Sequence, residues 1–353
     1  MRYIGNKRNL LEAIISIIQT LPDIKSITDV FAGTGTVSDR LSIDYNVVSN
    51  DNMYYSWIIQ YCSLKLQVLD FSKMPESLNT VDKVTNHFNT LGPDLVKGFI
   101  YNNYCPSGNN EYNRTYFTNE NGLIIDTIRT LGHNWFADNL ISSNEYIWII
   151  GNLLKCADKR ANTTSIYGAY LKQFSSISMK RIHFQEHFKV RTSDPHTCFC
   201  LDGRNVLDFQ KSDLLYMDPP YNNRQYCDNY HLLETIARYD SPLIHGKVGN
   251  RNNTIVKSNF CKKKTVACEF EYYFTNCKSK YILLSYSSDG LLKKTELLEL
   301  IERCEYTVLS FQEIPYRKFK SQNKGGSVVV DEYLITLTLK SAHDEQALHP
   351  HEP

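Results

Sequence analysis

The chain has 353 residues, of which 42% are hydrophobic and 22% are charged, and this balance excludes a disordered or fibrous protein. Lysine and arginine number 39 against 38 acidic residues, so the net charge is only +1 and bulk charge indicates neither a nucleic-acid nor a membrane partner. By region the charge is uneven: residues 151–280 hold 20 basic and 12 acidic side chains, whereas residues 1–150 hold 11 and 15 and residues 281–353 hold 8 and 11. The middle of the chain is therefore basic.

No apolar run approaches the ~20 residues that a membrane helix needs, and the N-terminus lacks the apolar stretch and cleavage site of a signal peptide. We therefore expect a cytoplasmic protein with no membrane partner. The ten cysteines are scattered and form no C-x-x-C pair, so we expect reduced thiols and no metal site.

The first 50 residues predict the opening of a doubly wound α/β sheet. Apolar side chains at helical spacing predict a helix over 7–20, and the apolar run at 27–31 predicts a buried strand. A loop of small residues follows, then a helix over 37–41 and a strand over 46–49 that ends at Asn50-Asp51. Strand, glycine-rich turn, helix, strand and acid in this order are typical of a Rossmann-like sheet.

Long amphipathic segments then replace the strands, and they predict a mostly helical insertion. The expected helices are 53–70, 119–133, 142–158 and 165–174. Strand-like runs return at 198–201, 214–217, 281–285, 306–312 and 328–339, of which the last two could form an antiparallel pair. The predicted domains are a discontinuous catalytic domain over 1–85 and 196–340, a helical target-recognition insertion over 86–195, and a flexible tail over 341–353.

The loop after the first strand could bring backbone close to a ligand, because Gly33 and Gly35 have no Cβ. Many glycine-rich turns serve packing alone, so this loop by itself favours neither interpretation. Asp51 favours a ligand, since a carboxylate at the end of the next strand can accept hydrogen bonds from both hydroxyls of a ribose. Val37 and Ser38 stand where a dinucleotide fingerprint has its third glycine, which favours an adenosine without a pyrophosphate.

The strongest chemical signal is Asp218-Pro219-Pro220-Tyr221, directly after the predicted strand 214–217. Two prolines fix the backbone and remove two N–H donors, so Asp218 and Tyr221 are held where doubly wound folds place their sites. Asp218 and a prolyl carbonyl can accept from an exocyclic NH2 while Tyr221 stacks on a flat base. The hydrogen bonds accepted from the NH2 group make the nitrogen a better nucleophile toward a methyl group held in line. A plain Pro-Pro surface turn is disfavoured by the flanking acid and aromatic ring.

These motifs resemble the D12-class, Dam-like N6-adenine DNA methyltransferases over nearly the whole chain. Tyr3-Ile4-Gly5-Asn6-Lys7 looks like the family's N-terminal cofactor motif, residues 31–35 its S-adenosylmethionine loop, and Asn50-Asp51 its ribose-binding acid. Asp218-Pro219-Pro220-Tyr221 looks like its catalytic motif. The cofactor loop precedes the catalytic motif, as in the α group, whose target-recognition segment lies between the two.

The resemblance implies a Rossmann-like methyltransferase that transfers a methyl group from S-adenosyl-L-methionine to a flipped-out adenine in double-stranded DNA. It also implies the modification enzyme of a restriction-modification system, with a possible cognate restriction endonuclease, acting as a monomer or weak dimer. Asp at 218 favours adenine, because N4-cytosine enzymes more often have Ser there. The implied catalytic residues are Asp218, Pro219, Pro220 and Tyr221, and the implied cofactor contacts are Tyr3, Lys7, Phe31, Gly33, Gly35, Asp51, Asp202 and Asp218.

Several of these residues have a structural alternative. Lys7 could be a solvated charge at a helix start, and Tyr3 could simply pack on that helix. For Asp202, capping the turn before Gly203 and touching the cofactor are equally favoured. Tyr226 and Tyr230 could close the site or serve the fold.

Basic side chains can neutralise phosphates and so position a duplex. The predicted DNA contacts fall in three runs, namely Lys172 and Arg181, then Lys262, Lys263 and Lys264, then Arg317, Lys318 and Lys320. For any one run a solvated face is the alternative, but three runs around one site favour DNA. Asn and Arg side chains at 102–114 are candidates for reading bases.

Two other functions remain open from the residues alone. The same pocket could methylate RNA or the amide of a protein Gln, although the basic insertion favours nucleic acid and Asp at 218 disfavours the amide. The chain could also be a DNA-binding module that has lost catalysis, which the intact catalytic turn argues against.

Overall fold

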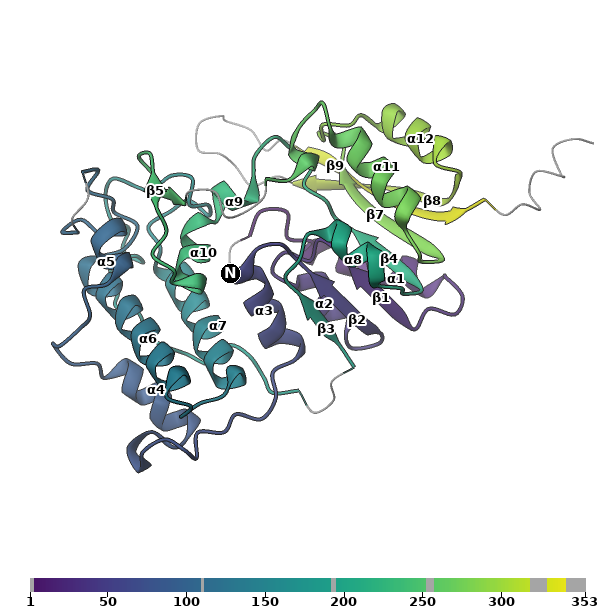
Figure 1. Ribbon diagram of the computed structural model, residues 1–353. Helices are drawn as coiled ribbons and strands as arrows, with labels where there is room; N and C mark the ends of the chain where they lie inside the picture. The colour runs from purple at the N-terminus through teal and green to yellow at the C-terminus, as the bar shows by residue number, and fades with distance from the viewer. Residues whose placement is uncertain (1–2, 109–110, 192–194, 252–256, 318–328, 341–353) are drawn as a thin grey trace, which may run out of the picture.

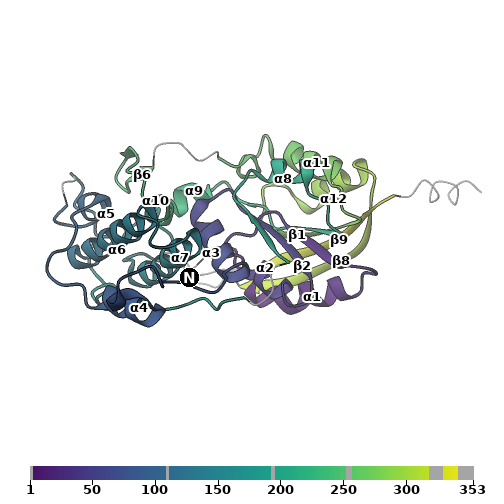
Figure 2. The ribbon, with the colours of Figure 1, turned by 60° about the horizontal axis from the view of Figure 1, so that its bottom comes forward.

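The computed structural model describes residues 3–108, 111–191, 195–251, 257–317 and 329–340. A twisted sheet with its covering helices forms one side of the molecule and a layer of long helices forms the other, with the N-terminus between them (Figure 1). Figure 2 shows the same division after rotation, with α4 to α7 toward one end and α1, α11 and α12 toward the other.

The central sheet has seven strands in the order β3-β2-β1-β4-β7-β9-β8. The strands are β1 (Ser26–Asp29), β2 (Asn46–Asn50), β3 (Thr197–Phe199), β4 (Leu214–Met217), β7 (Tyr281–Ser287), β8 (Tyr306–Arg317) and β9 (Val329–Leu339). Strands β3, β2, β1, β4 and β7 run parallel, and β9 runs antiparallel to both β7 and β8. The seven predicted strands and the antiparallel pairing of the last two are confirmed.

The chain moves outward from β1 to β2 and β3, then crosses to the other side of β1 to form β4. This reversal creates a crevice at the carboxyl ends of β1 and β4, where open α/β sheets bind their ligands. The prediction of a doubly wound sheet is confirmed. The switch point, where the strand order reverses between β1 and β4, lies beside the predicted cofactor loop and catalytic turn.

Both faces of the sheet are covered, and the alternation along β4 shows how. Leu214 and Tyr216 pack toward α1 (Leu11–Gln19) and α2 (Thr36–Leu41), whereas Leu215 and Met217 pack toward the opposite helices. Those helices are α8 (Gly203–Phe209), α11 (Val266–Asn276) and α12 (Lys294–Arg303). Successive side chains on a strand point to opposite faces, so a strand covered on both sides is apolar throughout.

The helical layer shares one large buried core. Its elements are α3 (Tyr54–Leu64), α4 (Val81–Asn89), α5 (Phe99–Tyr104), α6 (Asn119–Ala137), α7 (Ser143–Arg160), α9 (Tyr226–Asn229), α10 (His231–Arg238) and the hairpin β5 (Ile244–His245) and β6 (Asn250–Arg251). Thr118 caps α6, and a Ser142–Glu145 capping box begins α7. The predicted helices at 119–133 and 142–158 are confirmed.

Two helix predictions need correction. The helix predicted over 53–70 ends at Leu64, and the N–H groups of Gln67 and Asp70 bond to side chains at the start of α7 instead. Residues 165–174 form no helix, because the Asn162 amide bonds to the carbonyls of Leu171 and Gln173 and holds the segment as a loop.

The core of the helical layer is not one stretch of sequence. α3 comes before the predicted insertion and α10 follows the catalytic strand, yet both pack in this core, and α10 lies beside α6 and α7 in Figure 1. The boundaries at 86–195 stay a prediction.

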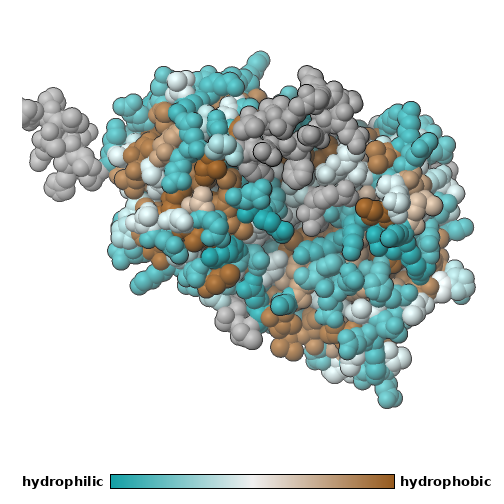
Figure 3. All heavy atoms as spheres, turned by 180° about the vertical axis from the view of Figure 1, so that it is seen from behind, coloured by the Kyte–Doolittle hydropathy of each residue, from teal (hydrophilic) through white to brown (hydrophobic). Residues whose placement is uncertain are grey.

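Within the described residues no helix has the length and apolarity to cross a membrane. The face in Figure 3 is mostly hydrophilic, with scattered hydrophobic patches.

Candidate active site

A pocket of about 220 Å³ opens at the switch point of the sheet. Its walls come from the ends of β1, β2 and β4, from the N-terminal segment at Tyr3–Lys7, and from the segment around Phe260. Of the predicted site residues, the following line it: Tyr3, Lys7, Phe31, Gly33, Asp51, Asp202, Asp218 and Pro220. Gly35, Pro219 and Tyr221 are not in this lining.

Gly33 brings its backbone close to the Tyr3 ring in the pocket wall. It has φ +54°, and a Cβ there would lie 2.7 Å from Cε1 of Tyr3. Its N–H donates to Oδ2 of Asp51 at 3.0 Å, and its carbonyl accepts from Nε2 of Gln60 at 2.8 Å. Gly35 also has a left-handed conformation, at φ +74°, and precedes α2. The loop therefore needs glycine for its backbone conformation and, at position 33, for contact with Tyr3.

Asp51 stands at the end of β2 with both oxygens engaged by backbone. Oδ1 accepts from the N–H of Met53 at 2.8 Å, while Oδ2 accepts from Gly33. Burial raises the pKa of Asp51 to about 7, although these two hydrogen bonds act in the opposite direction. Each carboxylate oxygen can accept more than one hydrogen bond, so the group is still able to receive ribose hydroxyls.

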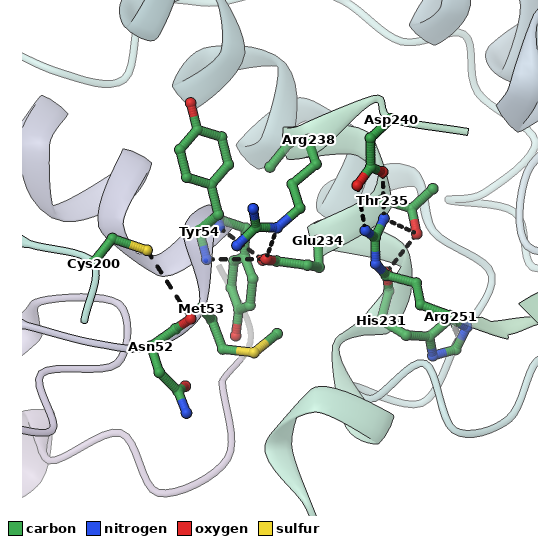
Figure 4. A network of polar contacts seen from close by, with 12 residues as sticks. Asn52, Met53, Tyr54, Cys200, His231, Glu234, Thr235, Arg238, Asp240 and Arg251 are labelled. Atoms are coloured by element: carbon green, nitrogen blue, oxygen red, sulfur yellow. Dashed lines mark hydrogen bonds and ion pairs between the residues drawn. The ribbon is translucent and has the colours of Figure 1, made fainter. Parts of the chain in front are cut away.

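A fully buried acid on α10 fixes the position of the turn that carries Asp51. Glu234 accepts from the N–H groups of Tyr54 and Tyr55 at 3.1 and 2.9 Å, and pairs with Nε of Arg238 at 2.5 Å (Figure 4). The carboxylate thus caps the N-terminus of α3, where the helix dipole favours negative charge. The sequence reasoning missed Glu234, because its partners lie about 180 residues away.

The far wall combines Asp202 with aromatic side chains. Oδ1 of Asp202 caps α8 by accepting from the N–H of Arg204 at 2.9 Å, and the same residue lines the pocket. The capping alternative is thus observed, and it leaves Oδ2 for a ligand. Phe31 packs against Phe260 and Tyr273 with ring centroids 5.3 and 5.2 Å apart. The last two residues also line the pocket and were missed, although aromatic residues within a basic run were a usable signal.

Tyrosines hold the N-terminal segment over the pocket. The ring of Tyr3 stacks on Tyr230 at 5.0 Å and contacts Tyr226 at 5.5 Å. Tyr230 is fully buried and accepts from the N–H of Ile4 at 2.7 Å, so its role is structural. Tyr226 donates to the carbonyl of Ile4 at 3.3 Å and also lines the pocket.

Lys7 is buried between two carboxylates, so the solvated-charge alternative is wrong. Its side chain is 4% exposed, with Nζ 3.0 Å from Oδ1 of Asp218 and 2.7 Å from Oε1 of Glu332. Burial alone would lower the pKa of Lys7, but attraction to Asp218 and Glu332 outweighs it and raises the pKa. Burial raises the pKa of Asp218, Lys7 lowers it, and Glu332 raises it. The sequence reasoning missed Glu332, an acid inside the apolar strand 328–339.

The catalytic turn follows β4 as predicted. Pro219 is buried and Pro220 faces the pocket. The Tyr221 ring lies beside Lys7, with Nζ 5.8 Å from its centroid, and the Tyr221 carbonyl accepts from the N–H of Leu291 at 2.9 Å. The Tyr221 ring is therefore held close to the Lys7 ammonium, which itself pairs with Asp218.

The predicted DNA contacts differ in their availability. Arg181 pairs with Glu120 and donates to the carbonyl of Leu91, and Lys263 pairs with Glu296 at 3.0 Å. Lys172 and Lys264 are exposed, and Nζ of Lys262 donates to Asn259 at 3.3 Å. Arg317 is the last residue of β8. Lys318 and Lys320 lie outside the described residues.

The segment at 102–114, predicted as a loop, begins inside α5. It contains one arginine, whose placement disfavours base reading. Arg114 is 4% exposed and donates to the carbonyls of Asn103, Gly246 and Lys247. Arg114 thus joins this segment to the β5–β6 hairpin.

Across the described residues, no group of three or more His, Cys, Asp or Glu side chains could hold a metal ion.

A doubly wound sheet, a pocket at its switch point and an Asp-Pro-Pro-Tyr turn on the same edge are the arrangement expected of an amino-methyltransferase. The sequence comparison identifies the family. Residues 3–300 match the family model of the D12 class N6 adenine-specific DNA methyltransferases. The chain belongs to this family.

Curated relatives are about one third identical to this chain over the aligned residues. Type II methyltransferase M.NlaIII of Neisseria lactamica is 34% identical over 91% of this chain and 93% of its own length. Type II methyltransferase M.FokI of Planomicrobium okeanokoites and modification methylase LlaI of Lactococcus lactis subsp. lactis are each 33% identical over 95% of this chain. The chain spans about half the length of these two, at 52% and 54%.

Proposed function

We propose that this chain transfers the methyl group of S-adenosyl-L-methionine to N6 of an adenine in double-stranded DNA. The observation that carries the proposal is the place of Asp218, which directly follows β4 and lines the same pocket as Gly33 and Asp51. The family match and the names of the relatives as type II methyltransferases and modification methylases support it.

The pocket fits the proposed cofactor. Gly33 presents backbone without a Cβ, and Asp51 and Asp202 present carboxylates at its two walls. Oδ1 of Asp29 and Oη of Tyr216 are buried without a hydrogen-bond partner among the described residues, and both residues line the pocket. Buried polar atoms in such a wall are completed by a polar ligand or by water. Tyr3, Phe31, Gly33, Asp51 and Asp202 would hold the cofactor, which supplies an electrophilic methyl group when bound.

Asp218 is the group proposed to bind the amino group of the target base. Lys7 occupies Oδ1, which leaves Oδ2 and a prolyl carbonyl to accept from the NH2, and Tyr221 to stack on the ring. The two prolines contribute no N–H donor that would compete for these acceptors. Extruding the base costs a few kcal/mol, which stacking and hydrogen bonding in the pocket offset. Accepting from the amine increases electron density at the nitrogen that attacks.

The test compares wild type with Asp218→Asn on mixed-sequence duplex DNA, using a labelled methyl donor. We expect label in N6-methyladenine with wild type and a loss of about a hundredfold or more in the variant, with cofactor binding by calorimetry retained. Asp208→Asn, an exposed acid outside the pocket, is the matched control. No label in adenine at any salt concentration, label in RNA or protein instead, or full activity of Asp218→Asn would each refute the proposal.

The biological setting is proposed on the relatives' names. Modification methylases and type II methyltransferases favour a cytoplasmic restriction-modification system with a cognate endonuclease, in which this chain acts as a monomer or weak dimer. Expression in a methylation-free bacterium, followed by single-molecule sequencing, would report the modified base and its sequence context together. A modified adenine without a fixed context would contradict a site-specific enzyme.

A further inference from the structure

A second carboxylate, that of Glu332, is buried beside the ion pair of Lys7 and Asp218. Glu332 is 3% exposed, and its Oε1 lies 2.7 Å from Nζ of Lys7 and accepts from Oγ of Ser285 at 2.8 Å. Strand β9 runs antiparallel to β7, and Glu332 pairs in register with Ser287 at the carboxyl end of β7. The reversed direction of β9 is what brings an acid from its first half to the edge where Asp218 lies.

The charges of this cluster do not cancel. Lys7 and Asp218 alone would form a neutral pair, in which the ammonium binds the acceptor that the reaction needs. Glu332 adds a second carboxylate to the same ammonium, so with both carboxylates ionised the three side chains sum to −1. Burying a carboxylate in excess of its cation is costly, and Lys7 with one acid would have been the less costly arrangement for stability alone. The excess negative charge therefore points to the chemistry at Asp218.

We propose that Glu332 is a positioning residue for the methyl transfer proposed above: it shares the Lys7 ammonium with Asp218, and it leaves the pocket negatively charged where the target nitrogen becomes positive. In that transfer the nitrogen lone pair forms the N–C bond to the methyl carbon while the C–S bond breaks and its electron pair stays on sulfur. The nitrogen then loses a proton to Asp218. Fixed negative charge beside a centre that becomes positive stabilises the transition state.

Other titratable groups face Asp218 besides Lys7 and Glu332. Asp29 on β1, Tyr216 on β4 and Tyr226 on α9 are close enough for its charge to raise their pKa values. Glu332 also raises the pKa of Tyr216, but that phenol is buried with its pKa held above the ordinary value, so it stays neutral with or without the Glu332 charge. A comparison between variants at Glu332 therefore isolates its contribution to the pH dependence.

The deciding variant is Glu332→Gln, which keeps the shape and removes the charge. We expect the single-turnover methylation rate on duplex DNA to fall about tenfold or more, with cofactor and DNA affinities within about twofold. The acid limb of the rate–pH profile should move to lower pH, because Asp218 then faces the Lys7 cation without the opposing carboxylate. A merely structural role would lower the rate and leave the acid limb in place.

Three further variants keep the result interpretable if Glu332→Gln is poorly folded. Ser285→Ala leaves the charge, so the acid limb should stay and the rate should change by less than about threefold. Glu332→Asp keeps the charge on a shorter side chain and should also keep the wild-type acid limb. Glu313→Gln, on the neighbouring strand and exposed, should match wild type.

The proposal is overturned if Glu332→Gln matches wild type, or if its rate falls without a shift of the acid limb to lower pH. It is equally overturned if the acid limb of Glu332→Asp moves to lower pH by as much as the shift expected for Glu332→Gln. The proposed function fails separately, when wild type itself puts no methyl group on adenine. The two failures are therefore distinguishable in one set of reactions.

Discussion

Gly33→Ala tests whether the loop after β1 needs glycine for ligand binding and not only for backbone conformation. Gly33 has φ +54°, and an added Cβ would lie 2.7, 2.8 and 2.9 Å from Cε1, Oη and Cζ of Tyr3. Gly246 is the matched control, because it has φ +66° and an added Cβ would meet nothing within 4 Å. The two alanine variants share the backbone strain and differ in the clash.

The magnitudes follow from these contacts. The left-handed conformation costs alanine about 1–2 kcal/mol, which the lower entropy of the unfolded alanine chain offsets by about 0.4–1 kcal/mol. In Gly33→Ala the Tyr3 ring must also shift, which disturbs its contacts with Tyr230 and Tyr226, and each aromatic contact contributes about 0.5–1.5 kcal/mol. We expect Gly33→Ala to be destabilised by about 1–3 kcal/mol more than Gly246→Ala.

Two assays decide the outcome. Urea unfolding compares the two variants with wild type, and calorimetry measures their affinity for S-adenosyl-L-methionine. Because Tyr3 and Gly33 both line the pocket, we expect Gly33→Ala to lose about tenfold or more in affinity, or about 1.4 kcal/mol, while Gly246→Ala binds normally. Equal stability of the two variants together with normal cofactor binding by Gly33→Ala would refute the reasoning.

Two further predictions concern charge. Burial raises the pKa of Asp29 to about 7, so the folded state keeps a proton that the unfolded chain has lost, and the contribution of Asp29 to the free energy of unfolding should fall from pH 4 to pH 7. Asp29→Asn should reduce that fall by at most about 4 kcal/mol in urea unfolding, and an unchanged slope would contradict it. Lys264→Ala should reduce the slope of log affinity for DNA against log salt by about 0.9, whereas Lys263→Ala should change it little because Glu296 already pairs with Lys263. Equal effects of the two lysines would refute this.

The inner strands were predictable because each contains a short run of buried apolar residues close to turn residues. β4 is buried along its whole length, and no amphipathic helix has such a pattern at that length. Two of the helices that were missed were open to prediction. α10 has Leu232, Leu233 and Ile236 at helical spacing, and α12 buries Leu297, Leu300 and Ile301 at helical spacing. The loop at 165–174 was not predictable from helical periodicity, because hydrogen bonds from the Asn162 amide to the carbonyls of Leu171 and Gln173 hold its conformation.

The site divides in a similar way. Asp51 and Asp218 were expected to converge because each follows a parallel strand, and parallel strands end at one edge. Glu332 could not be placed, because its position depends on β9 running antiparallel between β7 and β8. Glu234 likewise acts across the fold, on the N-terminus of α3. Acids that serve a partner remote in sequence carry no local pattern.

Some of the excess basic side chains of residues 151–280 form ion pairs with carboxylates elsewhere in the chain. Arg191 pairs with Asp39 and Arg181 with Glu120, acids of the first 150 residues, and Lys263 pairs with Glu296 from the C-terminal region. The acidic excess of the two ends therefore meets the basic excess of the middle in the folded chain. A basic side chain already paired with a carboxylate gains less from a phosphate, since it must exchange one anion for another. The salt dependence of DNA binding should accordingly reflect fewer phosphate contacts than the regional charge alone predicts.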